Sequence, residues 1–265
     1  MRKYFLILLG FVSILSAQEG SFALKTSILA MNMDYREYDD NSQILDSEKS
    51  DFSQMVGVGV GASYLLNATN GNYALLELTM EFLSGKTDYV GAYLSSNAGY
   101  GSLLGSTNNT ILNIEANYMY AQTLWENVHF LYGAAFGQRS WKRELSQSQV
   151  EVYKWVYGEP KIALQYQLDK MELRLMSGYK YGIHPKMSAT GIANDFNLGA
   201  ANTLEISFHA TYALSKTREI GCSYKYENQS IQKSNVVYGS DGTGYLEPDS
   251  TANNQYIRVT MVFKY

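Results

Sequence analysis

The chain has 265 residues, a formal net charge of −4 at pH 7 and one cysteine. A slightly acidic chain has no basic field that would attract nucleic acid, and the lone Cys222 cannot form an internal disulfide, which excludes a disulfide-stapled secreted scaffold. Three prolines stand against 23 tyrosines and 22 glycines, a balance that fits an exported β-barrel better than a soluble enzyme.

The first residues, MRKYFLILLGFVSILSAQEG, are typical of a secretory signal. Arg2 and Lys3 form a positively charged start, and the apolar stretch 4–14 after them is too short to span a bilayer as a helix. We therefore predict a signal peptide at residues 1–17 and a single domain at residues 18–265. The rest of the sequence has no apolar run of the length that a transmembrane helix needs, so no such helix is predicted.

Apolar and polar residues alternate along most of the remaining chain. In 202–214, for example, Leu204, Ile206 and Phe208 share one face, while the other face is mainly polar. This alternation predicts strands, because a helical period would scatter the polar residues around the axis. The predicted strands are 21–38, 51–66, 72–89, 109–124, 128–142, 150–167, 171–184, 202–214, 218–231 and 254–265. In the first strand the outward phase shifts around Ile28–Met31, which predicts either a β-bulge or the edge of the bilayer.

The connections between these strands alternate in length. Short ones fall at 67–72, 125–127, 168–170 and 215–217, and long polar ones at 40–50, 92–108, 143–150, 186–201 and 233–252. Soluble sandwiches share the residue alternation, but long strands, alternating loop lengths and aromatic residues near strand ends favour a membrane barrel. We predict an all-β fold, an up-and-down antiparallel transmembrane β-barrel of about ten strands in the cell outer membrane of a diderm (Gram-negative) bacterium, with short periplasmic turns.

The last predicted strand, within QYIRVTMVFKY, alternates strictly and stops on Tyr265. It is expected to close the barrel against the first strand, because unpaired backbone is not tolerated in lipid. It also resembles the C-terminal strand signal of bacterial outer-membrane proteins, so we expect the outer-membrane assembly machinery to recognise Tyr256–Tyr265. The other expected partners are the lipid bilayer and lipopolysaccharide. Nucleic acid is not expected, and the sequence leaves the oligomeric state open.

Charged residues of both signs fall on the predicted inward face. They are Glu77, Glu81, Glu115, Glu159, Lys161, Glu172, Arg174, Lys180, Glu205, Lys225, Glu227 and Arg258, together with Lys25, Arg139 and Lys264. Small barrels are usually filled by side chains, so the favoured interpretation is a largely occluded lumen in which these charges pair. A polar channel of mixed charge is the alternative.

Two segments, LYGAAFGQRSWKREL (131–145) and the stretch 153–183, resemble the middle of omptin-like ten-stranded outer-membrane barrels, and GKTDYVG (85–91) is similar to the top of their third strand. The resemblance implies a ten-stranded barrel and a peptidase site at the outer rim, built from an Asp pair and an Asp–His pair. This sequence offers Asp88 alone, and His184 with Asp195 eleven residues later. These three are rim candidates only, and no catalytic residue is carried over.

The sequence leaves three classes of function open. The favoured hypothesis is a non-enzymatic envelope or surface protein, the first alternative is a small porin or narrow channel, and the second is an omptin-like surface hydrolase. His129, His184 and His209 are too dispersed for a histidine-based metal site, and no phosphate-binding loop or zinc-protease motif is present, so no cofactor or metal is expected.

Overall fold

The computed structural model describes residues 20–67, 71–92, 99–190, 195–239 and 242–265, so the predicted signal peptide lies outside the described residues. In this part of the chain the strands are β1 (Gly20–Tyr38), β2 (Ile44–Lys49), β3 (Met55–Asn67), β4 (Tyr73–Gly91), β5 (Leu103–Trp125), β6 (Val128–Glu144), β7 (Val150–Leu168), β8 (Met171–Ala189), β9 (Phe196–Asn197), β10 (Ala201–Ala213), β11 (Arg218–Ile231), β12 (Val237–Tyr238), β13 (Gly244–Tyr245) and β14 (Asp249–Lys264). No helix among the described residues is long and apolar enough to cross a membrane.

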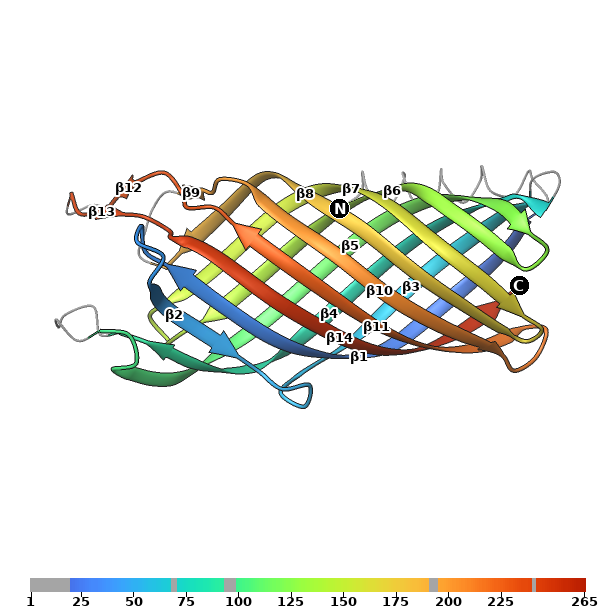
Figure 1. Cartoon of the computed structure of the whole chain (residues 1–265). Helices are drawn as coiled ribbons and strands as arrows, with labels where there is room; N and C mark the ends of the chain where they lie inside the picture. Colours follow the sequence, from blue (N-terminus) through green and yellow to red (C-terminus); the bar gives the residue numbers. More distant parts are fainter. Residues whose placement is uncertain (1–19, 68–70, 93–98, 191–194, 240–241) are drawn as a thin grey trace, which may run out of the picture.

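The ten long strands of the described chain form a closed antiparallel ring in the order β1-β3-β4-β5-β6-β7-β8-β10-β11-β14 (Figure 1). The last strand pairs with the first without interruption, from Ala23 opposite Lys264 to Tyr38 opposite Asp249. Closure leaves no sheet edge whose backbone groups would need water. The prediction of an up-and-down barrel of about ten strands is therefore confirmed.

Tight turns join neighbouring strands at one end of the barrel, where the chain also ends, and longer segments join them at the other (Figure 1). We call these the short-turn end and the long-loop end. The short connections predicted at 125–127, 168–170 and 215–217 are present, whereas 68–70 of the fourth lie outside the described residues.

Several strands run further toward the long-loop end than the sequence predicted. β5 begins at Leu103, β8 continues to Ala189 and β14 begins at Asp249. The segment predicted as a loop at 40–50 contains β2, which continues the ring above β3 by pairing with both β1 and β4. The prediction missed these parts because backbone pairing continues where the outward side chains are already polar, so the apolar alternation no longer marks the strand.

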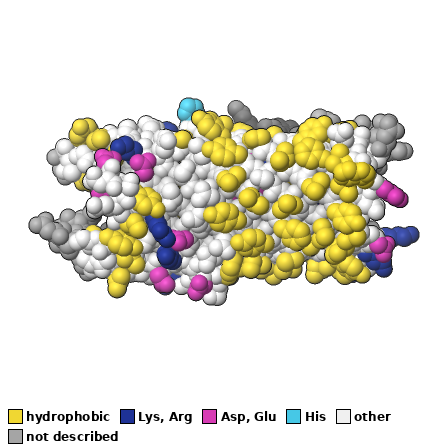
Figure 2. Space-filling view, viewed as in Figure 1, with side chains coloured by type: hydrophobic (Ala, Val, Ile, Leu, Met, Phe, Trp, Pro, Cys, Tyr) yellow, Lys and Arg dark blue, Asp and Glu magenta, His cyan; other side chains and the backbone are white. Residues whose placement is uncertain are grey.

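Apolar side chains cover the outer wall of most of the barrel (Figure 2). We call this surface the apolar belt; its exposed members include Val58, Val60, Met80, Phe82, Phe136, Ile162, Leu164, Leu175, Ile206, Phe208, Ile257 and Val259. Toward the long-loop end the outward positions become polar at Asn32, Ser84, Thr110, Gln138, Asn202, Asn228 and Gln255. The barrel therefore continues beyond the belt, and its long-loop end stands outside the bilayer.

Candidate functional site

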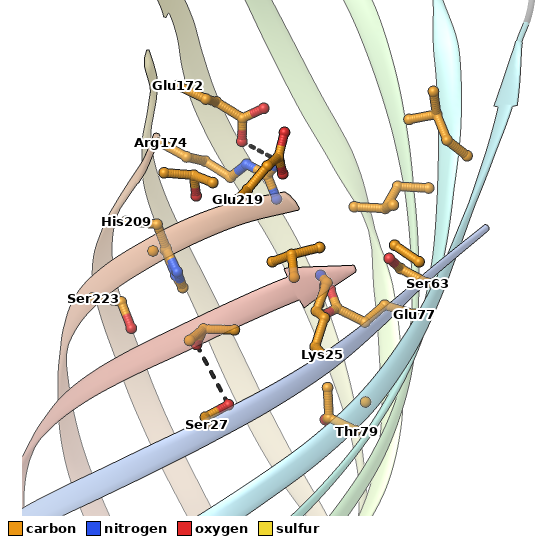
Figure 3. A pocket seen from close by; sticks show the side chains of 18 of the residues that line it. Lys25, Ser27, Ser63, Glu77, Thr79, Glu172, Arg174, His209, Glu219 and Ser223 are labelled. Carbon is orange, nitrogen blue, oxygen red and sulfur yellow. Dashed lines mark hydrogen bonds and ion pairs between the residues drawn. The ribbon is translucent and has the colours of Figure 1, made fainter. Parts of the chain in front are cut away.

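The short-turn half of the barrel contains a polar cavity of about 370 Å³ (Figure 3). Small side chains on β1 and β3, among them Ser27, Gly59 and Gly61, leave this space open. Six of the charged side chains that line it form three pairs: Lys25 Nζ lies 2.7 Å from Glu77, Arg174 lies 2.7 Å from Glu172, and Lys264 contacts Glu219. The cavity is therefore lined by polar side chains, and within each of these three pairs the two charges compensate each other.

Above this cavity, ion pairs cross the barrel interior. Their centre is Glu227 on β11, which is fully buried. Its carboxylate accepts hydrogen bonds from Arg139 on β6 at 3.0 Å, Lys180 on β8 at 2.7 Å, Lys225 at 2.9 Å and the Tyr256 hydroxyl on β14 at 2.9 Å. Because β6 and β11 lie nearly opposite in the ring, these bonds tie the two sides of the wall together.

The other residues expected in the lumen lie around this centre. Lys161 lies 2.6 Å from Glu115 and 3.1 Å from Glu159, and Lys180 also contacts Glu205, at 2.7 Å. The pairs Arg258–Glu81, Lys25–Glu77 and Arg174–Glu172 complete the set toward the short-turn end. All fifteen charged residues predicted for the inward face thus take part in ion pairs in the structure.

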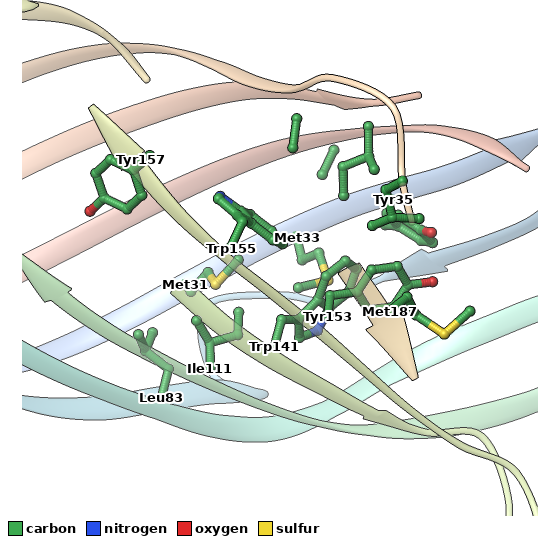
Figure 4. Packing of buried hydrophobic residues seen from close by; sticks show 14 of the residues in the cluster. Met31, Met33, Tyr35, Leu83, Ile111, Trp141, Tyr153, Trp155, Tyr157 and Met187 are labelled. Carbon is green, nitrogen blue, oxygen red and sulfur yellow. The ribbon is translucent and has the colours of Figure 1, made fainter. Parts of the chain in front are cut away.

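An apolar plug fills the barrel between the ion pairs and the long-loop end (Figure 4). We use this name for Met31, Met33, Leu83, Ile111, Trp141 and Trp155, each at most 5% exposed. The plug was not predicted from the sequence. The sequence signal for it was the phase change at Ile28–Met31, for which a bulge and the edge of the bilayer were the two interpretations. The bulge is wrong, because the pairing of β1 with β3 and β14 is regular there. The change marks the level where inward side chains become apolar.

The plug ends toward the long-loop end at a buried arginine on β6. Arg143, 1% exposed, contacts Glu37 at 2.6 Å, Glu48 at 2.8 Å and Glu151 at 2.9 Å, and Asp46 at 3.8 Å. Its guanidinium lies 4.5 Å from the ring centre of Tyr35 and 5.5 Å from that of Trp141. We call the group formed by Tyr35, Glu37, Asp46, Glu48, Arg143, Glu151, Tyr153 and Glu247 the Arg143 cluster.

The Arg143 cluster connects segments that are far apart in sequence. β2 contributes Glu48, whose carboxylate also accepts hydrogen bonds from Thr87 on β4 at 2.6 Å and Asn109 on β5 at 2.9 Å. The segment before β14 contributes Glu247, which accepts a hydrogen bond from Tyr153 on β7. This cluster was not predicted from the sequence, because 40–50 and 143–150 were assigned to loops. The sequence signal that was available is that Trp141 and Arg143 continue the inward positions of the strand predicted at 128–142, which β6 extends to Glu144.

Burial and charge shift the pKa values of the cluster, which lies beyond the apolar belt. Burial and the neighbouring Glu37 raise the pKa of Asp46 to about 8, and burial likewise raises the pKa of Glu151 and of Glu247. Although burial opposes it, the Arg143 guanidinium with the Thr87 and Asn109 hydrogen bonds lowers the pKa of Glu48. The cluster thus combines one carboxyl group whose pKa is lowered with three whose pKa is raised.

The three rim candidates do not form one site. His184 and Asp195 both line a depression of about 340 Å³ against β7 and β8, where His184 has a φ of +48° beside a register shift. Asp88 is exposed on β4 and does not line this depression; it pairs in register with Lys49 and Ser106. His184 and Asp195 thus share one depression, and Asp88 lies on a strand that does not border it.

Comparisons with known proteins agree with the architecture. No protein-family model and no curated protein matches the sequence. Among solved structures, the chain is similar to the outer membrane protease OmpT from Escherichia coli, with 11% identity over 94% of this chain and 98% of that one, and a TM-score of 0.55. It is also similar to the translocator domain of autotransporter NalP from Neisseria meningitidis, with 10% identity over 100% of this chain and 95% of that one, and a TM-score of 0.46.

The resemblance to omptin-like ten-stranded barrels is therefore confirmed for the fold, and identity this low says nothing of activity. A closed antiparallel ring with an outward apolar belt is the architecture of bacterial outer-membrane proteins. The chain is an outer-membrane β-barrel protein, and it resides in the cell outer membrane.

Proposed function

We propose that this protein is a closed, non-conducting outer-membrane barrel that acts as a non-enzymatic envelope protein through its surface end. The observation that carries the proposal is the plug, in which Met31, Leu83 and Ile111 are fully buried inside the ring. Barrels of this size have interiors that side chains can fill, whereas aqueous pores are typical of about 16 strands. The crossing ion pairs around Glu227 add a second obstruction below the plug.

The exposed part of the long-loop end supports a role in surface contacts. Val236, Tyr238, Tyr245 and Leu246, around the β12–β13 hairpin, are 49%, 67%, 39% and 46% exposed. Exposed aromatic and aliphatic side chains at the end of a barrel are suited to binding another surface molecule. The porin alternative is weaker because the plug fills the lumen on the long-loop side of the polar cavity. The hydrolase alternative is weaker because Asp88 does not line the depression that His184 and Asp195 share.

The proposed setting includes lipopolysaccharide and the assembly machinery as partners. On the outer wall beyond the belt, Lys154 and Lys186 lie opposite each other in register, where they can meet lipid phosphates. The strand from Tyr256 to Tyr265 is proposed as the segment that the assembly machinery recognises, since its outward face carries Ile257 and Val259 and it pairs along β1.

Conductance in planar lipid bilayers tests the closed state. The refolded, inserted protein is expected to give no single-channel steps. A variant that shortens the plug, Trp141→Ala with Trp155→Ala, should give intermittent steps, because both side chains are buried in the interior. Trp125→Ala is the matched control, since Trp125 is 68% exposed near a short turn, and it should stay silent. Regular steps from the unmodified protein would refute the proposal.

A further inference from the structure

The Arg143 cluster contains more acid than base. Five carboxyl groups, Glu37, Asp46, Glu48, Glu151 and Glu247, are each at most 9% exposed. The guanidinium of Arg143 contacts the first four of them, and Glu247 accepts a hydrogen bond from Tyr153. Ionising all of them would leave an excess of buried negative charge, which proteins avoid by binding protons or cations. The described residues contain no group of acidic, histidine or cysteine side chains arranged to hold a metal ion, so we assign the excess charge to protons.

Within the cluster, Asp46 is the least compensated carboxyl group. It lies directly opposite Glu37 in the register of β1 and β2, and like charges in that position repel. Its Oδ1 atom is buried and has no hydrogen-bond partner. Its Oδ2 atom accepts a hydrogen bond from Tyr89 at 3.3 Å and lies 3.8 Å from Arg143. By contrast, Glu48 on the same strand is fully satisfied by Arg143, Thr87 and Asn109.

We propose that the Arg143 cluster is a proton-operated latch: protonated Asp46 holds β2 in the barrel wall at the long-loop end, and loss of its proton releases β2 from β1 and β4. β2 is the element that would move, because it has six residues and, within the described parts of the chain, pairs with the upper parts of β1 and β4. This inference goes beyond the proposed function, since it concerns a local opening of the surface end and not conduction through the lumen.

The groups that face Asp46 set the direction of the switch. They are Tyr35 and Glu37 on β1, Glu48 on β2, Tyr89 on β4, Arg143 on β6, Glu151 and Tyr153 on β7, and Glu247 before β14. The pKa of Asp46 is raised from 3.8 in the exposed state to about 8 in the closed state. The proton on Asp46 therefore stabilises the closed state fully when the pH is below 3.8. This stabilisation is lost as the pH rises through about 8.

Hydrogen exchange of β2 measures the latch. The experiment compares protection factors of the backbone amides of 44–49 at pH 6 and pH 9 in the refolded full chain, corrected for the intrinsic exchange rate. Across this range the opening equilibrium of the wild-type chain should increase on the order of tens of fold, from the shift of a single carboxyl group. Asp46→Asn carries a neutral side chain at every pH and should show little change. Glu247→Gln provides a second neutral variant, with a smaller pH dependence than the wild type.

Asp88→Asn is the matched control. Asp88 is the same residue type, on the β4 strand that pairs with β2, but it is exposed outside the cluster, so this variant should keep the wild-type pH dependence. Unchanged protection of β2 in the wild type between the two pH values would overturn the proposal. A wild-type loss of protection that persists undiminished in Asp46→Asn would also overturn it. Neither result depends on whether the barrel conducts, so the latch and the closed lumen are tested separately.

Discussion

Replacing Glu227 by glutamine tests whether the crossing ion pairs stabilise the barrel. The glutamine would keep the size of the side chain but remove the charge that Arg139, Lys180 and Lys225 share. Lys180 would retain Glu205 at 2.7 Å, and Lys225 would retain it at 3.7 Å. Arg139 would retain no carboxylate partner among the described residues, and its Nε already lacks a hydrogen bond. A buried guanidinium would thus be left uncompensated.

The expected loss follows from this uncompensated charge. Removing one partner of a buried ion pair costs about 3–5 kcal/mol, so we expect Glu227→Gln to lower the free energy of unfolding by that amount. Glu172→Gln is the matched control, because the Glu172–Arg174 pair has the same chemistry but side chains that are 30% and 22% exposed. A partly exposed pair contributes about 0–1 kcal/mol, and the control should lose no more than that.

Equilibrium urea unfolding in phospholipid vesicles measures both variants. The double variant Glu227→Gln with Arg139→Met should recover part of the loss, since it removes the stranded charge together with its partner. Equal losses for Glu227→Gln and Glu172→Gln would refute the reasoning. So would a loss below about 1 kcal/mol for Glu227→Gln, the range of an exposed pair.

Three further outcomes are expected from the same unfolding measurement. Ile162→Arg, in the middle of the belt part of β7, should cost about 2–4 kcal/mol, whereas Val152→Arg, beyond the belt on the same strand, should cost about 0–1 kcal/mol; equal costs would place the membrane elsewhere. Gly133→Ala should destabilise by about 1–3 kcal/mol, because a Cβ there would collide with the backbone carbonyl oxygen of Tyr118 on β5; a neutral result would contradict the close strand approach. Glu48→Gln should weaken the barrel at neutral pH and lose this effect as the pH falls below the ordinary carboxyl range, because the native pKa of Glu48 is lowered; a pH-independent penalty would show that the charge of Glu48 is not what stabilises.

The outward half of the structure could be predicted from the sequence. A lipid-facing strand must present an apolar residue at every second position, so Leu204, Ile206 and Phe208 mark both the strand and its outer face. The charged residues on the alternate positions, such as Glu205 and Glu227, could be predicted to face inward for the same reason. The local period is sufficient for both predictions, and neither needs knowledge of which strands face each other.

The sequence predicted only some of the strand segments beyond the belt; it missed β2, the starts of β5 and β14 and the end of β8. There the outward positions are polar, as at Asn32 and Gln138, while inward positions such as Met33 and Trp141 are apolar. The pattern therefore reverses relative to the bilayer region, and a prediction that follows the apolar face interprets the change as a bulge or a loop. Spacing along the chain also did not show that His184 and Asp195 share a depression that Asp88 does not line.

The sequence by itself determined that the chain forms strands of alternating character, how many of them cross the membrane and which side of each meets lipid, because these follow from local period and loop length. Only the tertiary structure decided which inward residues meet. Arg139 and Glu227 are 88 residues apart, and Arg143 and Glu37 are 106 apart; closure of the ring brings them together. The crossing ion pairs, the plug and the Arg143 cluster depend on that closure, since every contact across the lumen joins residues whose proximity exists only once the last strand has paired with the first.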